Sequence, residues 1–171
     1  MNTIIRYALL FGLFFIMQVF IFNRLELGFG AYIFILPLYL MILPFETNVF
    51  ALILVGFVLG ISVDALSNTF GLTASSMVLF AFLRPIIFEA FRPRDGYDPL
   101  KFPTAGDMGW VWFVVVFGIL FASSLLWFFV LEVFRWGETL LILRNFFCSL
   151  IASALVISVS QFFFFNTGRK K

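Results

Sequence analysis

The sequence predicts an all-α integral membrane protein with six transmembrane helices and both termini in the cytoplasm. Apolar residues make up 63% of the 171 residues, only 12% are charged, and the mean hydropathy is +1.12. Soluble domains are about half apolar and about a quarter charged, and a soluble core at this chain length cannot absorb so much apolar surface. The apolar residues also fall into six runs, which we interpret as one membrane domain over residues 1–171.

The six expected spans follow one another with short connections. In the first span, Arg6 precedes an apolar region, as in a secretion signal. The span is too long for such a signal and no small-residue cleavage pattern follows it, so we expect an uncleaved helix. The second is short, because fourteen residues of helix reach about 21 Å of a roughly 30 Å core. Its Pro37 and Pro44 favour a kink or a short, broken helix. The expected spans are residues 4–22, 31–44, 48–63, 71–91, 110–133 and 139–165.

Small and polar residues mark the helix faces expected to meet other helices. In the third span, Gly56, Gly60 and Asp64 lie one turn apart on a single face. Small residues at this spacing let helix backbones approach closely in a membrane. The sixth span carries serines and alanines among its apolar residues, so we expect it to face inward as well. The candidates for helix packing or a partner interface are Gly56, Gly60, Asp64, Gly71, Ser149 and Ser153.

Asp64 needs a polar partner, because a carboxylate facing lipid is costly. In one interpretation it is an interfacial residue that ends the third helix, with Ser67 or Asn68 capping the fourth. In a second, it forms an ion pair with Arg144 in the sixth span. A third interpretation is ion or proton coupling, for which the sequence offers no relay partners.

The orientation follows from the positive charges, which are enriched on the cytoplasmic side of membrane proteins. Seven Lys and Arg residues lie on the side that holds both termini and the connection over residues 92–109, against two on the other side. Prolines and glycines make that connection irregular rather than a domain. We place Arg84, Arg92 and Arg94 at the cytoplasmic face, with Arg84 extending toward the headgroups or forming a salt link to Glu89.

Catalysis and cofactor binding have no support in the sequence. There is no histidine and a single cysteine, Cys148, so disulfides within the chain, histidine metal sites and His-containing triads are excluded. Asp64 is the only acid away from the ends of the spans, which excludes a pair of facing intramembrane aspartates. No long basic run exists, so nucleic-acid binding is not expected. We therefore predict a protein that is not an enzyme and that has no cofactor or metal.

The order of several short motifs over the whole chain resembles the bacterial rod shape-determining protein MreD family. The motifs are Pro37-Leu38, Gly56-Phe57-x-x-Gly60-x-x-x-Asp64, Gly71-Leu72, Leu83-Arg84-Pro85 and Arg92-Pro93-Arg94-Asp95-Gly96-Tyr97-Asp98.

The resemblance implies a non-enzymatic scaffold or regulatory subunit of the cell-elongation machinery in the inner (cytoplasmic) membrane. The implied partner is MreC, a single-span protein, in a larger complex with RodA, a penicillin-binding protein and MreB that supports peptidoglycan synthesis. The fold of the family is similar to the six-helix substrate-binding subunit of energy-coupling-factor vitamin transporters. A subunit of that kind is the alternative function, against which the outer connections are short and poor in polar side chains.

Overall fold

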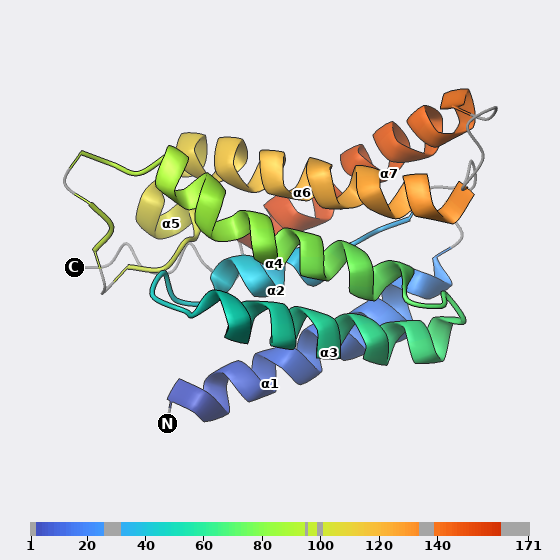
Figure 1. Cartoon of the computed structure of the whole chain (residues 1–171), viewed down its shortest axis with the longest axis horizontal. Coiled ribbons are helices and arrows are strands. Elements are labelled where there is room, and N and C mark those ends of the chain that lie inside the picture. The colour runs from blue at the N-terminus through green and yellow to red at the C-terminus, as the bar shows by residue number, and fades with distance from the viewer. Residues whose placement is uncertain (1–2, 26–31, 95, 99–100, 134–138, 162–171) are drawn as a thin grey trace.

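The computed structural model describes residues 3–25, 32–94, 96–98, 101–133 and 139–161, and the regular elements among them are all helical (Figure 1). Five helical segments are long and apolar enough to span a membrane: Ile5–Arg24, Val49–Ser67, Leu72–Ala90, Trp110–Val133 and Thr139–Ser160. The chain is therefore a multi-pass membrane protein. In order, the elements are α1 (Thr3–Ile16), a π turn η1 (Met17–Ile21), a 3-10 turn η2 (Phe22–Arg24), α2 (Leu36–Ile42), α3 (Val49–Ser67), α4 (Leu72–Ala90), α5 (Ala105–Met108), α6 (Trp110–Val133) and α7 (Thr139–Ser160).

The long helices lie alongside one another and define two ends of the bundle (Figure 1). At one end, which we call the loop end, the Arg6 guanidinium lies 5.6 Å from the centre of the Phe102 ring, and the Ala105 amide donates to Gln161 Oε1 at 3.3 Å. The other end holds residues 68–71 between α3 and α4, and we call it the turn end. The first and last described residues, Thr3 and Gln161, therefore both lie at the loop end.

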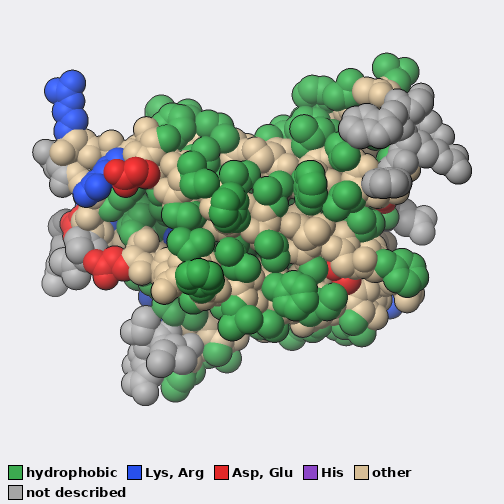
Figure 2. All heavy atoms as spheres, in the orientation of Figure 1, with side chains coloured by type: hydrophobic (Ala, Val, Ile, Leu, Met, Phe, Trp, Pro, Cys, Tyr) green, Lys and Arg blue, Asp and Glu red, His purple; other side chains and the backbone are tan. Residues whose placement is uncertain are grey.

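Apolar side chains cover the outside of the bundle between these ends. Figure 2 shows them over the visible face of α3, α4 and α6, while most of the visible charged side chains gather at the loop end. Phe50 and Val111 are each 82% exposed, which is costly in water and expected in lipid.

The second predicted span is present as a non-helical leg (residues 32–35) followed by the seven-residue helix α2. The predicted short, broken helix is confirmed, and Pro37 stands in its first turn, where a missing N–H costs nothing. A non-helical residue advances the chain by up to about 3.3 Å, against 1.5 Å in a helix. The leg therefore gives the segment more reach than the same number of helical residues. Every residue of α2 is buried between the long helices.

The glycine stripe of α3 packs against α4. A Cβ atom on Gly60 would overlap the Ala74 Cα and lie 2.8 Å from the Ala74 nitrogen, while one on Gly56 would lie 3.1 Å from the Met77 oxygen. The packing role predicted for these two glycines is confirmed, and the helix that packs against them is α4 of the same chain. Gly71 differs, because nothing lies within 4 Å of its Cβ position and its φ of +87° is the left-handed conformation that glycine adopts easily. Gly71 therefore has no close packing contact among the described residues and lies in the turn, and its role at a partner interface stays a prediction.

One part of the connection over residues 92–109 departs from the irregular structure that its composition predicts. Residues Ala105–Met108 form the single-turn helix α5, after the last proline of the connection, Pro103. Two side chains hold this turn, because Gln161 accepts the Ala105 amide and Asp107 accepts the Phe102 amide at 3.0 Å. One local partner, Asp107, and one distant partner, Gln161, thus support a helix that local propensity does not indicate.

Candidate functional site

Asp64 caps the helix that follows it. Its carboxylate accepts the backbone N–H groups of Thr73 at 3.1 Å and Ala74 at 2.9 Å, and it also accepts the Thr69 hydroxyl. Those two amides are the second and third of α4, which have no partner within their own helix. Asp64 is 3% exposed, and the positive end of the α4 dipole adds to its stabilisation.

Within the described residues, Asp64 and Arg144 form no ion pair. Arg144 lies on the exposed side of α7 and donates to Asn145 Oδ1 at 3.3 Å. The predicted pair is not formed because the short turn between α3 and α4 places the first amides of α4 beside Asp64. Neither Ser67 nor Asn68 caps α4, since the N-cap position is Gly71, and Asp64 reaches the amides from the preceding helix.

Arg84 lies inside the bundle and does not extend to the headgroups. It is 1% exposed, and its guanidinium donates to the backbone oxygens of Leu43, Met41 at 3.3 Å and Pro44 at 3.2 Å. These carbonyl groups lie at or just past the C-terminal end of α2, where helix carbonyls lack partners and carry partial negative charge. The expected cytoplasmic-face position of Arg84 is therefore wrong, because α2 supplies its acceptors.

The salt link of Glu89 is with Arg92, at 3.3 Å, and not with Arg84. Both Arg92 and Arg94 are exposed at the loop end, so two of the three arginines assigned to one face lie there. The Arg84 guanidinium instead lies over the ring of Phe88, 4.6 Å from its centre. This contact adds a cation–π attraction to the bonds with the carbonyl groups.

The non-helical leg is held by side chains of η1 and α7. The amides of Tyr32 and Phe34 donate to the hydroxyls of Ser149 and Ser153, at 2.8 and 2.9 Å. Gln18 accepts the Ile35 amide at 3.0 Å and donates to the Ile33 oxygen at 2.9 Å. Irregular backbone at membrane depth is tolerated only where protein satisfies its polar groups. Ser149 and Ser153 satisfy amides of the leg, and because they are fully buried they are not open to a partner protein.

A cavity of about 270 Å³ lies at the turn end, where the leg meets η2, α3, α4 and α6. A chain of hydrogen bonds forms part of its wall, because Gln18 donates to Asn23 and Asn23 donates to Ser67, both at 2.7 Å. The polar lining residues are Gln18, Asn23, Arg24, Tyr32, Ser67, Thr69 and Thr73. The apolar lining residues are Val19, Phe34, Val63, Leu66, Leu125 and Phe128.

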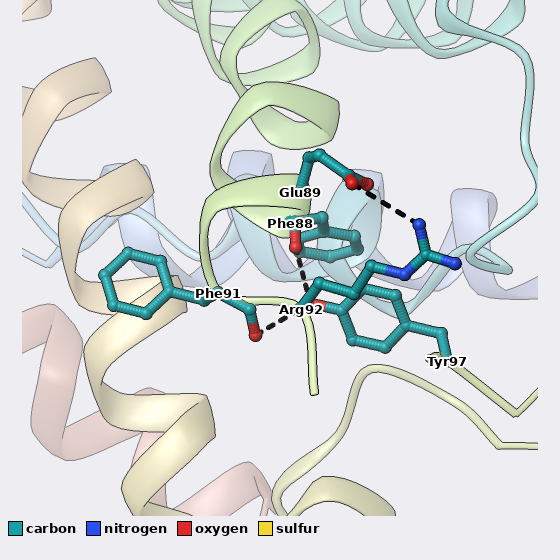
Figure 3. A network of polar contacts seen from close by, with 5 residues as sticks. All are labelled: Phe88, Glu89, Phe91, Arg92 and Tyr97. Atoms are coloured by element: carbon teal, nitrogen blue, oxygen red, sulfur yellow. Dashed lines mark hydrogen bonds and ion pairs between the residues drawn. The ribbon is translucent and has the colours of Figure 1, made fainter. Parts of the chain in front are cut away.

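At the loop end, Tyr97 fixes the connection to the bundle (Figure 3). Its hydroxyl donates to the backbone oxygen of Phe88 at 2.7 Å, and its ring stacks on Phe45 with centres 4.3 Å apart. The ring of Trp112 meets Tyr97 edge to face. Burial raises the pKa of the Tyr97 phenol above its usual 10.0, so the hydroxyl keeps its proton and remains a donor. The connection is thus attached through aromatic packing.

No metal site is found in the part of the chain that the structure describes, where three His, Cys, Asp or Glu residues nowhere gather. The structure adds Gln18 and Asn23, which the sequence analysis did not single out. The signal for Gln18 was present, since it is the only amide inside the first apolar run. The signal for Asn23 was weaker, because it stands at the end of that run, where polar residues are ordinary.

Comparisons with known proteins gave no match to a protein-family model, a curated protein or a solved structure.

Proposed function

We propose that the chain is a non-enzymatic scaffold subunit of the bacterial cell-elongation machinery. In this proposal it binds a single-span, MreC-like partner in the inner membrane and supports peptidoglycan synthesis alongside RodA, a penicillin-binding protein and MreB. The supporting observation is that Asp64, Arg84, Gln18, Ser149 and Ser153 are all bound to backbone groups of the chain itself. Buried groups used in this way hold a fold together, so we assign the function to the surface.

The proposed topology has six crossings, with the loop end in the cytoplasm. It is supported by the position of Thr3 and Gln161 at the same end, because a chain that begins and ends on one side crosses an even number of times. The leg and α2 then supply the crossing that no long helix makes. We expect a cysteine at Arg94→Cys to react only from inside and one at Phe70→Cys only from outside, each in a Cys148→Ser background. Labelling of both from the same side would contradict six crossings.

The partner surface has to be a face that the chain does not use itself. Small residues allow a partner helix to approach closely in lipid, but Gly56 and Gly60 are covered by α4. On α7, Ala154 and Ser158 stand one turn apart and are exposed. We therefore assign this face to the helix of the single-span partner.

The assignment is tested by affinity capture of the tagged chain in detergent, together with its depletion from a rod-shaped bacterium. Depletion should round the cells, and Ala154→Leu should reduce capture of the single-span partner because a branched side chain keeps the helices apart. The matched control is Ala8→Leu, which makes the same change on an exposed position of α1. Depleted cells that keep their rod shape and lose uptake of a vitamin would refute the scaffold function.

The alternative function, a vitamin-binding subunit of an energy-coupling-factor transporter, has one observation in its favour. The cavity at the turn end has the position expected for a substrate pocket near the outer helix ends. Its volume of about 270 Å³ is below the roughly 300–1,000 Å³ of pockets for drug-sized ligands, which favours a smaller group. In this alternative, Ala8→Leu and not Ala154→Leu would separate the chain from its energising partner.

A further inference from the structure

The turn-end cavity lies away from the helix face that we assign to the partner protein. We propose that it binds a small, net-negative, phosphate-bearing headgroup, with Arg24 as the cation and the hydroxyls of Thr73 and Ser67 as donors. Such a group could come from an anionic lipid of the facing leaflet or from a soluble phosphate ester, and the experiment below distinguishes the two.

Thr73 is the first reason for assigning a ligand. Its side chain lines the cavity, it is 4% exposed, and its hydroxyl has no hydrogen-bond partner among the described residues. A threonine within a helix can donate to the carbonyl four residues earlier, but Thr73 is the second residue of α4, and its position −4 lies in the turn. The Thr73 oxygen is not among the fully buried atoms that lack a partner, so it is open to the cavity and can donate to a ligand there.

The neighbouring polar groups also present donors. Ser67 accepts the hydrogen bond from Asn23, which leaves its own proton to be donated. Arg24 lies at the cavity in η2. Asp64 bonds to the lining residues Thr69 and Thr73, but its carboxylate is already occupied by these donors and it is not itself among the described lining residues. An arginine with hydroxyl donors and without a lining carboxylate favours an anion, and the planar guanidinium matches the geometry of phosphate oxygens.

The apolar wall and the volume define the rest of the ligand. Phe34 and Phe128 form part of the inner wall, and Leu66, at the rim, is 58% exposed. A cavity of about 270 Å³ accepts a headgroup but not a large cofactor. A polar group inside and an exposed apolar rim suit a molecule whose charged end enters the cavity while its chains stay in the bilayer.

The test is the melting temperature of the purified full chain in detergent, titrated with three probes. Phosphatidylglycerol and phosphatidylcholine with the same acyl chains compare net charge, and glycerol 3-phosphate supplies the phosphate without the lipid. We expect phosphatidylglycerol to raise the melting temperature more than phosphatidylcholine does. Arg24→Gln and Thr73→Val should each raise its half-saturating concentration about tenfold, as expected for the loss of one strong hydrogen bond.

Two further variants keep the test independent of folding. Arg24→Lys retains the charge and should recover part of the affinity, whereas Arg144→Gln removes an exposed arginine on α7 and should leave the phosphatidylglycerol response unchanged. Saturation by glycerol 3-phosphate alone, lost in Arg24→Gln, would assign the site to a soluble phosphate ester. Equal responses to the two lipids without a response to glycerol 3-phosphate, or unchanged responses in both Arg24→Gln and Thr73→Val, would overturn the proposal.

Discussion

A methyl group added to Gly60 should destabilise the bundle. The new Cβ would overlap the Ala74 Cα and lie 3.1 Å from the Thr73 carbonyl carbon, so every close atom belongs to the backbone of α4. Backbone cannot rotate away as a side chain can, and α3 and α4 must move apart. Overpacking of this kind costs about 1–3 kcal/mol. This exceeds the gain of roughly 0.5–1 kcal/mol when alanine replaces glycine within a helix.

The other glycines provide a graded series in which the chemical change is constant. Gly118→Ala in α6 has nothing within 4 Å of the new atom, so the chain should gain the helix-propensity term and become more stable. Gly56→Ala meets the Met77 oxygen at 3.1 Å and Leu40 Cδ1 at 3.2 Å, one of which is a movable side chain. We expect it to fall between the other two.

The measurement is thermal unfolding of the three purified variants in one detergent. For a chain of this size, 1 kcal/mol corresponds to about 2–4 °C in melting temperature. Gly60→Ala should therefore melt several degrees below the wild type and Gly118→Ala slightly above it. If Gly60→Ala melted at or above the wild type, the close contact of α3 with α4 would be refuted.

Four further substitutions, with two control variants, test the internal bonds of the chain by the same melting assay. Ser153→Ala should cost about 1–3 kcal/mol, because the buried Phe34 amide loses its acceptor, and Ser149→Ala should cost less, because the bond from the Tyr32 amide is only partly buried. The control Ser123→Ala, whose hydroxyl bonds within its own helix, should cost little. Asp64→Asn should destabilise by about 0.5–2 kcal/mol as the cap of α4 weakens, and equal stability would show that the carboxylate is dispensable. Arg84→Met should destabilise strongly, because the oxygens of Met41 and Leu43 lose the Arg84 donor, while Pro44 keeps its bonds from Thr47. Arg92→Ala removes only an exposed pair and should change stability by less than about 1 kcal/mol.

The features that the sequence predicted well are local. Hydropathy located the long helices to within a few residues at most ends, because lipid-facing residues are apolar along a whole segment. Pro37 and the short length of its apolar run indicated the broken second segment. The spacing of Gly56 and Gly60 identified a close-packed face, although it did not say that α4 would be the neighbour.

The polar contacts could not be predicted because they join distant residues through the backbone. Ser149 lies 117 residues from the amide it accepts, and Arg84 lies 41 residues from Leu43. The predictions that Asp64 pairs with Arg144 and that Arg84 extends to the headgroups were based on charge alone. A sequence shows which side chains are charged, but it does not show which backbone carbonyl and amide groups will lack partners. The carbonyl groups that Arg84 binds and the amides that Ser149 and Ser153 bind lack helical partners because α2 is short and its leg is not helical.

The backbone bonds of Asp64 and Arg84 argue against ion or proton coupling inside the bundle. Ion or proton coupling requires an intramembrane group that changes its charge or partner during the cycle. Protonating Asp64 would weaken its bonds to the amides of Thr73 and Ala74, and moving Arg84 would release the carbonyl groups at the end of α2. Either change removes bonds to buried backbone groups and therefore costs stability. These contacts therefore favour a rigid bundle in which the lipid-facing helices and the cavity at the turn end are the remaining candidates for binding.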